Sequence, residues 1–298
     1  MQSSLYGLVI LSASAFFYAT YGIFSKLIGG AFEPFTQSWT RGVVTLLCFL
    51  SFGLFKNIFV KIQKVDIKWY VVVGVIGSLA VAPTFYSLAN LNIGTALFVQ
   101  YAATVITSHV LGLVFLKEKL AGKNILALVL AFTGLFLVYM GDIYVNLDKL
   151  VPLIAAVISG SFFSIWFVFS KKISSKYPTL QINTYGYLFA ITINFLLAQL
   201  VGEPLNTDFG SKAWLANIGY GVVGFAGSGL AVYGFKFIDA HKGSIVLLSE
   251  IIIGVLFGLL LFGEVLNLTT LLGGILIVVS IALPNVIALY LRNGHKKI

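Results

Sequence analysis

Residues 5–28 read LYGLVILSASAFFYATYGIFSKLI, and residues 151–171 read VPLIAAVISGSFFSIWFVFSK. Each stretch carries almost no charge and is long enough for a helix that crosses a bilayer, which needs roughly 20 apolar residues. The whole chain has this character, since 59% of its 298 residues are hydrophobic, 10% are charged and the mean hydropathy is +1.01. So few charges cannot cover a water-exposed surface. The sequence therefore predicts an integral membrane protein and excludes a soluble one.

Charge clusters and Gly, Pro and Asn positions divide the chain into ten apolar runs, each predicted to be a membrane-spanning helix. The predicted spans lie at residues 5–28, 36–55, 69–89, 95–116, 124–141, 151–171, 180–201, 214–237, 244–262 and 268–290. Long apolar runs favour helices, because the strands of a membrane barrel would show alternating polarity. The predicted fold class is an all-α integral membrane protein.

Basic residues are distributed unevenly between the two sides of this predicted bundle. If the N-terminus is cytoplasmic, 15 of the 19 Lys and Arg residues fall on the cytoplasmic side, as the positive-inside rule requires. These are Lys56, Lys61, Lys64, Lys68, Lys117, Lys119, Lys123, Lys171, Lys172, Lys176, Lys236, Lys242, Arg292, Lys296 and Lys297. We therefore expect a multi-pass protein of the cell inner or plasma membrane with both termini cytoplasmic, whose positive charge needs no nucleic acid as a partner.

The second half of the chain repeats the first at an offset of about 145 residues, which indicates a duplicated half rather than a solenoid unit. Phe24-Ser25-Lys26 recurs as Phe169-Ser170-Lys171, and Ser14 recurs as Ser159. Because each half contains an odd number of spans, the second half enters the membrane from the opposite side. The sequence thus predicts two inverted five-helix repeats, residues 1–147 and 148–298. Inverted repeats are typical of secondary transporters that bind a solute at the bilayer midplane between the halves.

The ends of the fourth and ninth predicted spans are similar to each other. They read Phe115-Leu116-Lys117-Glu118-Lys119-Leu120 and Leu261-Phe262-Gly263-Glu264-Val265-Leu266. With Glu250 fourteen residues before Glu264 and the two five-helix halves, the chain resembles the EamA-type transporters of the drug/metabolite transporter superfamily over almost its whole length. It departs from the family pattern at Lys117, where Gly is usual, and at Ile251, where Pro is usual. The resemblance implies secondary transport of a small organic solute, often an amino acid or metabolite, and commonly efflux.

Two ionisable residues within the spans are candidates for coupling transport to protons. Glu250 is expected about 9 Å inside the ninth span, and a carboxylate at such a depth usually marks a pathway or a proton site. It binds a substrate amine or a proton, or it is the structural partner of Lys236 or Lys242. His109 on the fourth span is either a proton relay or a neutral histidine bonded to a neighbouring helix.

Aromatic and polar residues on several spans are candidates for the solute path. Ser14, Tyr18, Tyr21 and Ser25 share one helix face, and the aligned face carries Trp166. Such rings could stack on a flat or cationic solute, or could pack the two halves together. Interruptions are expected at Pro83 and at Gly227-Ser228-Gly229, as is typical of helices that line cavities. The predicted substrate-binding residues are Tyr18, Tyr21, Tyr86, Gln100, Tyr101, Thr104, Trp166, Tyr233 and Glu250.

Arg41 is expected one turn inside the second span. It either lies at the interface, where Glu33 could pair with it, or binds a substrate carboxylate. Glu118 and Glu264 are expected to end helices at the surface in structural roles.

No enzyme motif is found in the sequence. Three His residues and the single Cys48 form no ligand cluster, and there is neither a phosphate-binding loop nor a nucleophile elbow. We therefore expect a transporter without a cofactor or metal. The alternative is a membrane-embedded enzyme or a lipid-modifying scaffold, which would need such a cluster at one interface.

Overall fold

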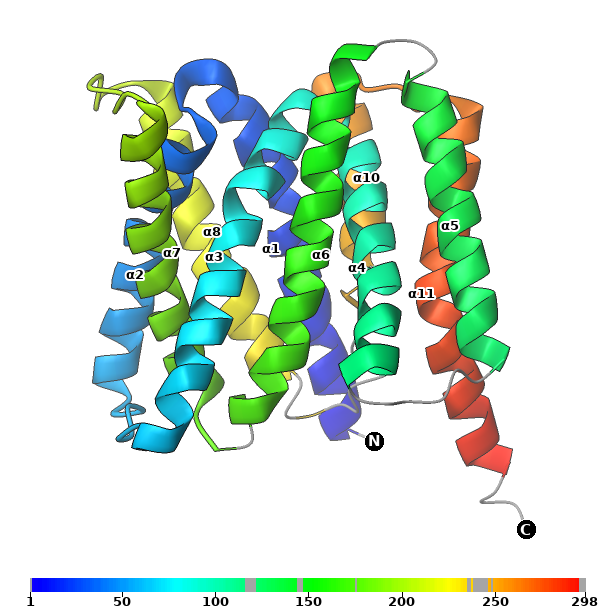
Figure 1. Ribbon diagram of the computed structural model, residues 1–298, viewed down its shortest axis with the longest axis horizontal. Coiled ribbons are helices and arrows are strands. Elements are labelled where there is room, and N and C mark those ends of the chain that lie inside the picture. Colours follow the sequence, from blue (N-terminus) through cyan, green and yellow to red (C-terminus); the bar gives the residue numbers. More distant parts are fainter. Residues whose placement is uncertain are drawn as a thin grey trace.

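The structure is a computed structural model, and it describes residues 2–115, 122–143, 147–174, 176–234, 237, 246–247 and 249–294. Within these residues the chain forms ten α-helices and three short 3₁₀ turns, and it contains no strand. The helices lie side by side in a single bundle (Figure 1). The all-α prediction is confirmed.

The helix bounds agree with the predicted spans to within a few residues. The helices are α1 (Gln2–Ile28), α2 (Pro34–Phe55), α3 (Ile67–Asn90), α4 (Ile93–Phe115), α5 (Gly122–Ile143), α6 (Leu150–Ser174), α7 (Thr179–Val201), α8 (Lys212–Gly234), α10 (Ser249–Phe262) and α11 (Leu268–Gly294). The turns are η1 (Gly29–Ala31), η2 (Lys64–Asp66) and η3 (Leu147–Lys149). The predicted start of the ninth span at residue 244 lies outside the described residues.

The surface of the bundle is apolar over much of its height. Leu200, Leu215 and Leu260 expose 80%, 72% and 73% of their area, and most other exposed large side chains on the helices are aliphatic or aromatic. Four helical segments, beginning at Leu5, Pro34, Lys64 and Leu180, are long and apolar enough by composition to cross a membrane. A protein in water rarely exposes such a large continuous apolar surface. Hydrocarbon accommodates it, so the helices are membrane spans.

The two halves of the bundle are inverted relative to each other. Helix α1 begins at the lower face of Figure 1, where both chain ends lie, whereas α6 begins at the upper face. We call the lower face the terminal face and the upper one the distal face. The packing repeats accordingly: α1 packs against α8, and its counterpart α6 packs against α3, the counterpart of α8. In the same way α10 contacts α1 while α4 contacts α6. The predicted inverted repeat is confirmed.

The expected interruptions in the third and eighth spans were wrong. Helix α3 continues through Pro83, and α8 continues through Gly227-Ser228-Gly229. In hydrocarbon no water is present to bond to free backbone groups, so a membrane helix keeps its backbone hydrogen bonds before and after a proline. Gly227 serves close packing instead, because a Cβ at this position would stand 3.1 Å from the ring of Tyr18 on α1, whereas Gly229 has open space around it.

Glu264 ties the halves together at the distal face. Gly263, with a φ of +64°, ends α10 and turns the chain back. The side chain of Glu264 is consequently 9% exposed, its Oε1 lies 3.0 Å from Lys26 Nζ, and its Oε2 accepts a 2.7 Å hydrogen bond from Ile93 N at the start of α4. The structural role expected for Glu264 agrees with these contacts, but its expected place at the surface was wrong. Glu118 lies outside the described residues.

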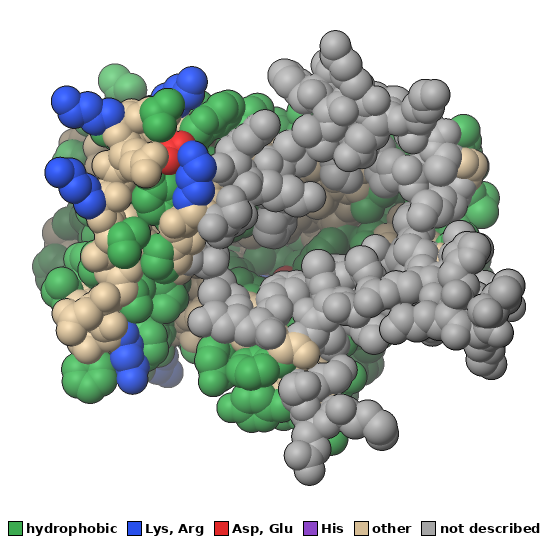
Figure 2. All heavy atoms as spheres, turned by 90° about the horizontal axis from the view of Figure 1, so that it is seen from below, with side chains coloured by type: hydrophobic (Ala, Val, Ile, Leu, Met, Phe, Trp, Pro, Cys, Tyr) green, Lys and Arg blue, Asp and Glu red, His purple; other side chains and the backbone are tan. Residues whose placement is uncertain are grey.

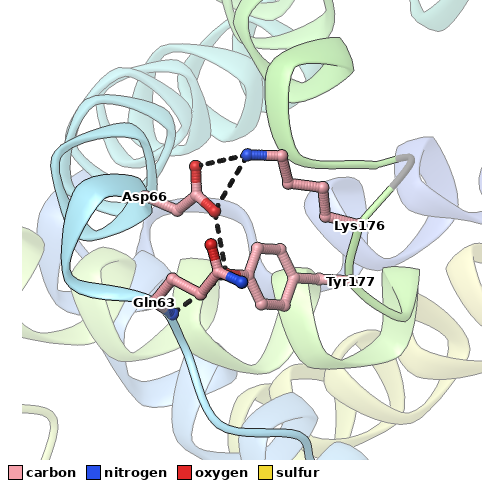
Figure 3. A network of polar contacts seen from close by, with 4 residues as sticks. All are labelled: Gln63, Asp66, Lys176 and Tyr177. Carbon is pink, nitrogen blue, oxygen red and sulfur yellow. Dashed lines mark hydrogen bonds and ion pairs between the residues drawn. The ribbon is translucent and has the colours of Figure 1, made fainter.

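A second polar network joins the halves at the terminal face (Figure 3). Asp66, in the segment between α2 and α3, accepts hydrogen bonds from Lys176 Nζ at 2.9 Å and from the Tyr177 hydroxyl at 2.9 Å. The same hydroxyl accepts a bond from Gln63 N at 3.0 Å. The hydrogen bond from Lys176 holds the pKa of Asp66 below its usual value, and the bond from Tyr177 acts in the same direction.

Candidate functional site

A carboxylate and a phenol meet between α4 and α10, which are counterparts in the two halves. The hydroxyl of Tyr101 donates a 2.7 Å hydrogen bond to Oε2 of Glu250. Counted along each helix from its distal end, Tyr101 lies about 12 Å deep and Glu250 about 18 Å deep. Both therefore lie near the middle of a hydrocarbon layer about 30 Å thick. At this depth Glu250 is partly exposed rather than fully buried.

Small residues on α10 explain why the two side chains meet. A Cβ on Gly254 would stand 2.6 Å from Leu97 of α4, so a glycine lets the two helices approach closely. Glu250 precedes Gly254 by one turn and Tyr101 follows Leu97 by one turn, so they share the same contact face. Lys236 and Lys242, the alternative partners of Glu250, lie outside the described residues.

A group of tyrosines lies beside this pair. We call Tyr18, Tyr21, Tyr187 and Tyr220 the tyrosine cluster. The ring of Tyr21 packs edge-on against Tyr18 at 5.5 Å and against Tyr220 at 4.7 Å between centroids. Tyr18 lies within electrostatic range of both Glu250 and Tyr187. The cluster therefore extends from the Tyr101–Glu250 pair on α4 and α10 to α7 and α8.

Arg41 lies at the other end of the tyrosine cluster. Its guanidinium carbon is 4.0 Å from the ring centroid of Tyr220 and 5.9 Å from that of Tyr21, in cation–π geometry. The side chain is 8% exposed and its Nη1 has no hydrogen-bond partner. In the part of the chain that the structure describes, no carboxylate pairs with it, and Glu33 is exposed. The interfacial or Glu33-paired arginine is therefore not what the structure contains.

Buried amides and hydroxyls between α2 and α8 fix the backbone that carries Arg41. Asn217 donates a 2.8 Å hydrogen bond to Oγ1 of Thr40, and its Oδ1 accepts one of 3.2 Å from Gln37. One turn beyond Arg41, Thr45 Oγ1 donates to the carbonyl of Gly221 at 2.9 Å. These bonds between the halves hold Arg41 and Tyr220 in register.

Two more of the predicted residues, Gln100 and Thr104, lie on α4 near Tyr101. Thr104 Oγ1 donates to the carbonyls of Gln100 and Gly160, at 2.9 and 3.0 Å, and so belongs to the contact between α4 and α6. The side-chain oxygen of Gln100 is buried and has no hydrogen-bond partner. Among the described residues no donor bonds to the Gln100 side-chain oxygen, whereas Thr104 holds two helices together.

The other predicted residues have contacts on other parts of the bundle. Trp166 packs on α3, where its indole lies 2.8 Å from the position of a Cβ on Gly77. Tyr86 is half-buried near the distal end of α3. Tyr233, which is 44% exposed, packs against Tyr6 and Phe237 at the terminal face. The side chain of His109 lies outside the described residues.

The terminal face is hollowed near its centre, and hydrophobic side chains are visible inside the hollow (Figure 2). Lysines gather to one side of this face. They include the exposed Lys56, Lys61, Lys64, Lys68 and Lys176, at the ends of α2, α3 and α6.

Comparison with known proteins assigns this architecture to a family. Residues 5–140 and residues 150–286 each match the EamA-like transporter family. The chain belongs to this family. An uncharacterized transporter of Archaeoglobus fulgidus is 29% identical over 93% of this chain and 95% of the relative, and one of Helicobacter pylori strain J99 is 25% identical over 94% and 95%. A protein of known crystal structure has the same fold, with a TM-score of 0.66 at 18% identity over 96% of this chain and 98% of that one.

This EamA-like protein is accordingly a multi-pass membrane transporter and not an enzyme. Within the described residues no group of three or more metal-ligating side chains occurs. The family match and the relatives named as transporters set aside the alternative of a membrane-embedded enzyme.

Three members of the site in this EamA-like protein were not predicted from the sequence. Tyr187, Tyr220 and Thr45 converge with Tyr21 near Gly224, where a Cβ would stand 3.2 Å from the Tyr21 hydroxyl and 3.9 Å from that of Tyr187. The repeat places valines opposite both new tyrosines, so the comparison of the halves could not find them. The spacing of Tyr220, Gly224 and Ser228 at successive turns on one face of α8 is the pattern that could have indicated them.

Proposed function

We propose that this EamA-like protein is a secondary transporter that moves a small organic solute, an amino acid or a related amine, outward by alternating access. The Tyr101–Glu250 hydrogen bond carries the proposal, because it places a carboxylate between counterpart helices of the two halves. Inverted-repeat transporters commonly hold the solute at such a position. The moving units are residues 1–147 and 148–298.

Glu250 binds either the amine of the solute or the coupling proton in this proposal. A carboxylate at the centre of a span costs about 2.5 to 3.5 kcal/mol on insertion scales, so it is kept for a function. Tyr101 occupies Oε2, and no described residue bonds to Oε1. That oxygen is the one available to a cation or a proton. His109 is the second candidate for proton coupling.

The aromatic residues serve the solute at different depths. Tyr18 lies near Glu250, Tyr21 packs against Tyr18, and both offer faces on which a cation or a flat group could stack. Gln100 and Tyr101 supply polar contacts at the same level, with Thr104 next to them. Tyr86 and Tyr233 lie nearer the faces and would contact the solute as it enters or leaves, and Trp166, on α6 against α3, would contact it between them.

We assign the terminal face to the cytoplasm of a cell inner or plasma membrane, so that both termini are cytoplasmic. The exposed lysines of this face support the assignment. The hollow would then load solute from inside, in agreement with efflux.

In a Cys48→Ser background, a cysteine at Asn57 should react with an impermeant maleimide only in opened cells, and one at Thr207 should react in intact cells. Both positions are exposed, at opposite faces. Labelling with the reverse pattern would contradict the assignment.

Transport itself is tested with purified protein in liposomes. Labelled amino acids, amines and sugars are offered with and without an imposed pH gradient, and protein-free liposomes serve as the control. We expect saturable movement of an amine or amino acid that the gradient accelerates. If only sugars move, the solute class is wrong; if none moves, the function is wrong.

One substitution distinguishes the two possible roles of Glu250, proton coupling and binding of the solute amine. If Glu250 carries a proton, Glu250→Gln should abolish gradient-driven movement and leave solute exchange, because a neutral amide bonds but does not titrate. If it binds the amine, both assays should lose affinity. Asp208→Asn, which removes an exposed carboxylate, is the matched control. Wild-type behaviour of Glu250→Gln in both assays would remove Glu250 from the mechanism.

A further inference from the structure

Arg41 is a buried cation to which none of the described carboxylates is paired. The residue is 8% exposed and lies about 10 Å along α2 from the distal end. Its guanidinium lies over the fully buried ring of Tyr220 and not at the interface. Lys26, which like Arg41 belongs to the distal half of its helix, pairs with Glu264. Lys176 at the terminal face pairs with Asp66. Among the described residues, Arg41 has no such partner.

The ring beneath the guanidinium orients it without neutralising it. Tyr220, itself fully buried, lies 4.0 Å below the guanidinium carbon, and Tyr21 flanks it at 5.9 Å. An aromatic face attracts a cation, but it accepts none of the hydrogen bonds of the fork. Nη1 consequently remains a buried donor with no acceptor. A buried donor that lacks an acceptor is costly and rare in proteins unless a ligand supplies one.

We infer that Arg41 binds the carboxylate of the transported solute, so that the solutes are organic carboxylates, including zwitterionic amino acids. This inference rests on the proposed transport function and names a subsite that lies apart from Glu250. Arg presents a planar fork that matches a carboxylate, whereas Lys offers only a point charge. The tyrosine cluster links the two charges, since Tyr21 contacts Arg41 and Tyr18 lies near Glu250. A zwitterion would thus meet a cation on one side and a carboxylate on the other.

Polar side chains gather beside Gly224, one turn after Tyr220 on α8. The hydroxyls of Tyr21 and Tyr187 approach the position of its missing Cβ to 3.2 and 3.9 Å, and Thr45 Oγ1 approaches it to 3.6 Å. Polar atoms from α1, α2 and α7 therefore face one glycine on α8.

Binding is measured as ligand-dependent thermal stabilisation of the full chain in detergent, so that transport is not required. The probes are leucine and phenylalanine, their methyl esters, 3-phenylpropionate, and inorganic phosphate. We expect the free carboxylates to stabilise the wild type and the esters to bind at least tenfold more weakly. Arg41→Gln should lose the preference for the acid over its ester, and Arg41→Lys should recover it only in part. Lys212→Gln, which removes an exposed cation at the distal face, is the matched control and should behave as wild type.

The stability of the unliganded protein separates a binding role from a structural one. Removing a buried charge that has no partner should leave the melting temperature of Arg41→Gln unchanged or raise it. A large fall in that temperature without ligand would show that Arg41 serves packing and would overturn the inference. Equal binding of acids and esters, binding of phosphate alone, or no binding of any carboxylate would also overturn it. Transport of amines alone in liposomes would leave the proposed transport standing while this inference fails.

Discussion

Ser14 and Ser159, which occupy equivalent positions in the two repeats, each bond to the third helix of the other repeat. Ser14 Oγ on α1 donates a 2.7 Å hydrogen bond to the carbonyl of Gly227 on α8, and Ser159 Oγ on α6 lies 2.6 Å from Thr84 Oγ1 on α3. Each serine thus connects the first helix of its own half to the third helix of the other. Both side chains are fully buried. The duplicated sequence is therefore also a duplicated contact between the halves.

Removing either serine hydroxyl should destabilise the protein by a similar amount. For Ser14→Ala and Ser159→Ala we expect losses of about 0.6 kcal/mol each and at most about 1.7 kcal/mol, the average and the maximum measured for hydrogen bonds between membrane helices. The measurement is thermal unfolding in detergent. Ser51→Ala, at an exposed position on α2, should change little. A loss confined to one of the two buried sites would contradict their equivalence.

Tyr101 and Glu250 should act as one unit. Tyr101→Phe removes the donor to Oε2, and a hydrogen bond to a charged group is worth about 1.5 to 3 kcal/mol, so solute affinity should fall by about tenfold or more. Combined with Glu250→Gln, the two losses should fall well short of additive in a double-mutant cycle of solute affinities. Tyr139→Phe, on the exposed surface of α5, is the control. Additive losses would mean that the two residues act independently.

Gly160 should be irreplaceable, whereas Gly186 should not. A Cβ on Gly160 would overlap the backbone carbonyl of Gln100, so Gly160→Ala has to push α6 away from α4. We expect a loss of at least 1 to 3 kcal/mol, the cost of overpacking, together with weaker solute binding. Around Gly186 the structure leaves open space, so Gly186→Ala should be neutral or slightly stabilising. Melting temperatures of the two variants, measured side by side, decide the point.

Asp66 should make the protein sensitive to acid. The hydrogen bond from Lys176 lowers the pKa of Asp66 in the folded protein, with Tyr177 acting in the same direction. The stabilisation is therefore fully present above the ordinary aspartate pKa, about 4, and is lost as the pH falls through the lower, folded-state value. Asp66→Asn should be less stable than wild type at neutral pH, and this difference should shrink below about pH 4. Asp208→Asn provides the control, and an undiminished difference in acid would contradict the linkage.

The sequence alone determined the ten helices and their inverted arrangement. A span such as residues 151–171 has no stable alternative in hydrocarbon, because every backbone group has to bond within its own segment. The recurrence of Phe24-Ser25-Lys26 then indicated duplication, and the odd number of spans per half determined the inversion. These inferences needed only local composition and counting, so they could be made without coordinates.

Only the tertiary structure decided which polar residues meet. Glu250 could be recognised because a carboxylate in a span is costly, but its bond to Tyr101 depends on how Gly254 lets α10 approach α4. Tyr21 and Trp166 are equivalent by sequence, yet the first joins the tyrosine cluster while the second packs on α3. Helical periodicity gives the face of a residue on its own helix, whereas its partners follow from the rotation and separation of neighbouring helices. For this reason the sequence left the role of Arg41 open, and the position of Tyr220 beneath its guanidinium decided between the alternatives.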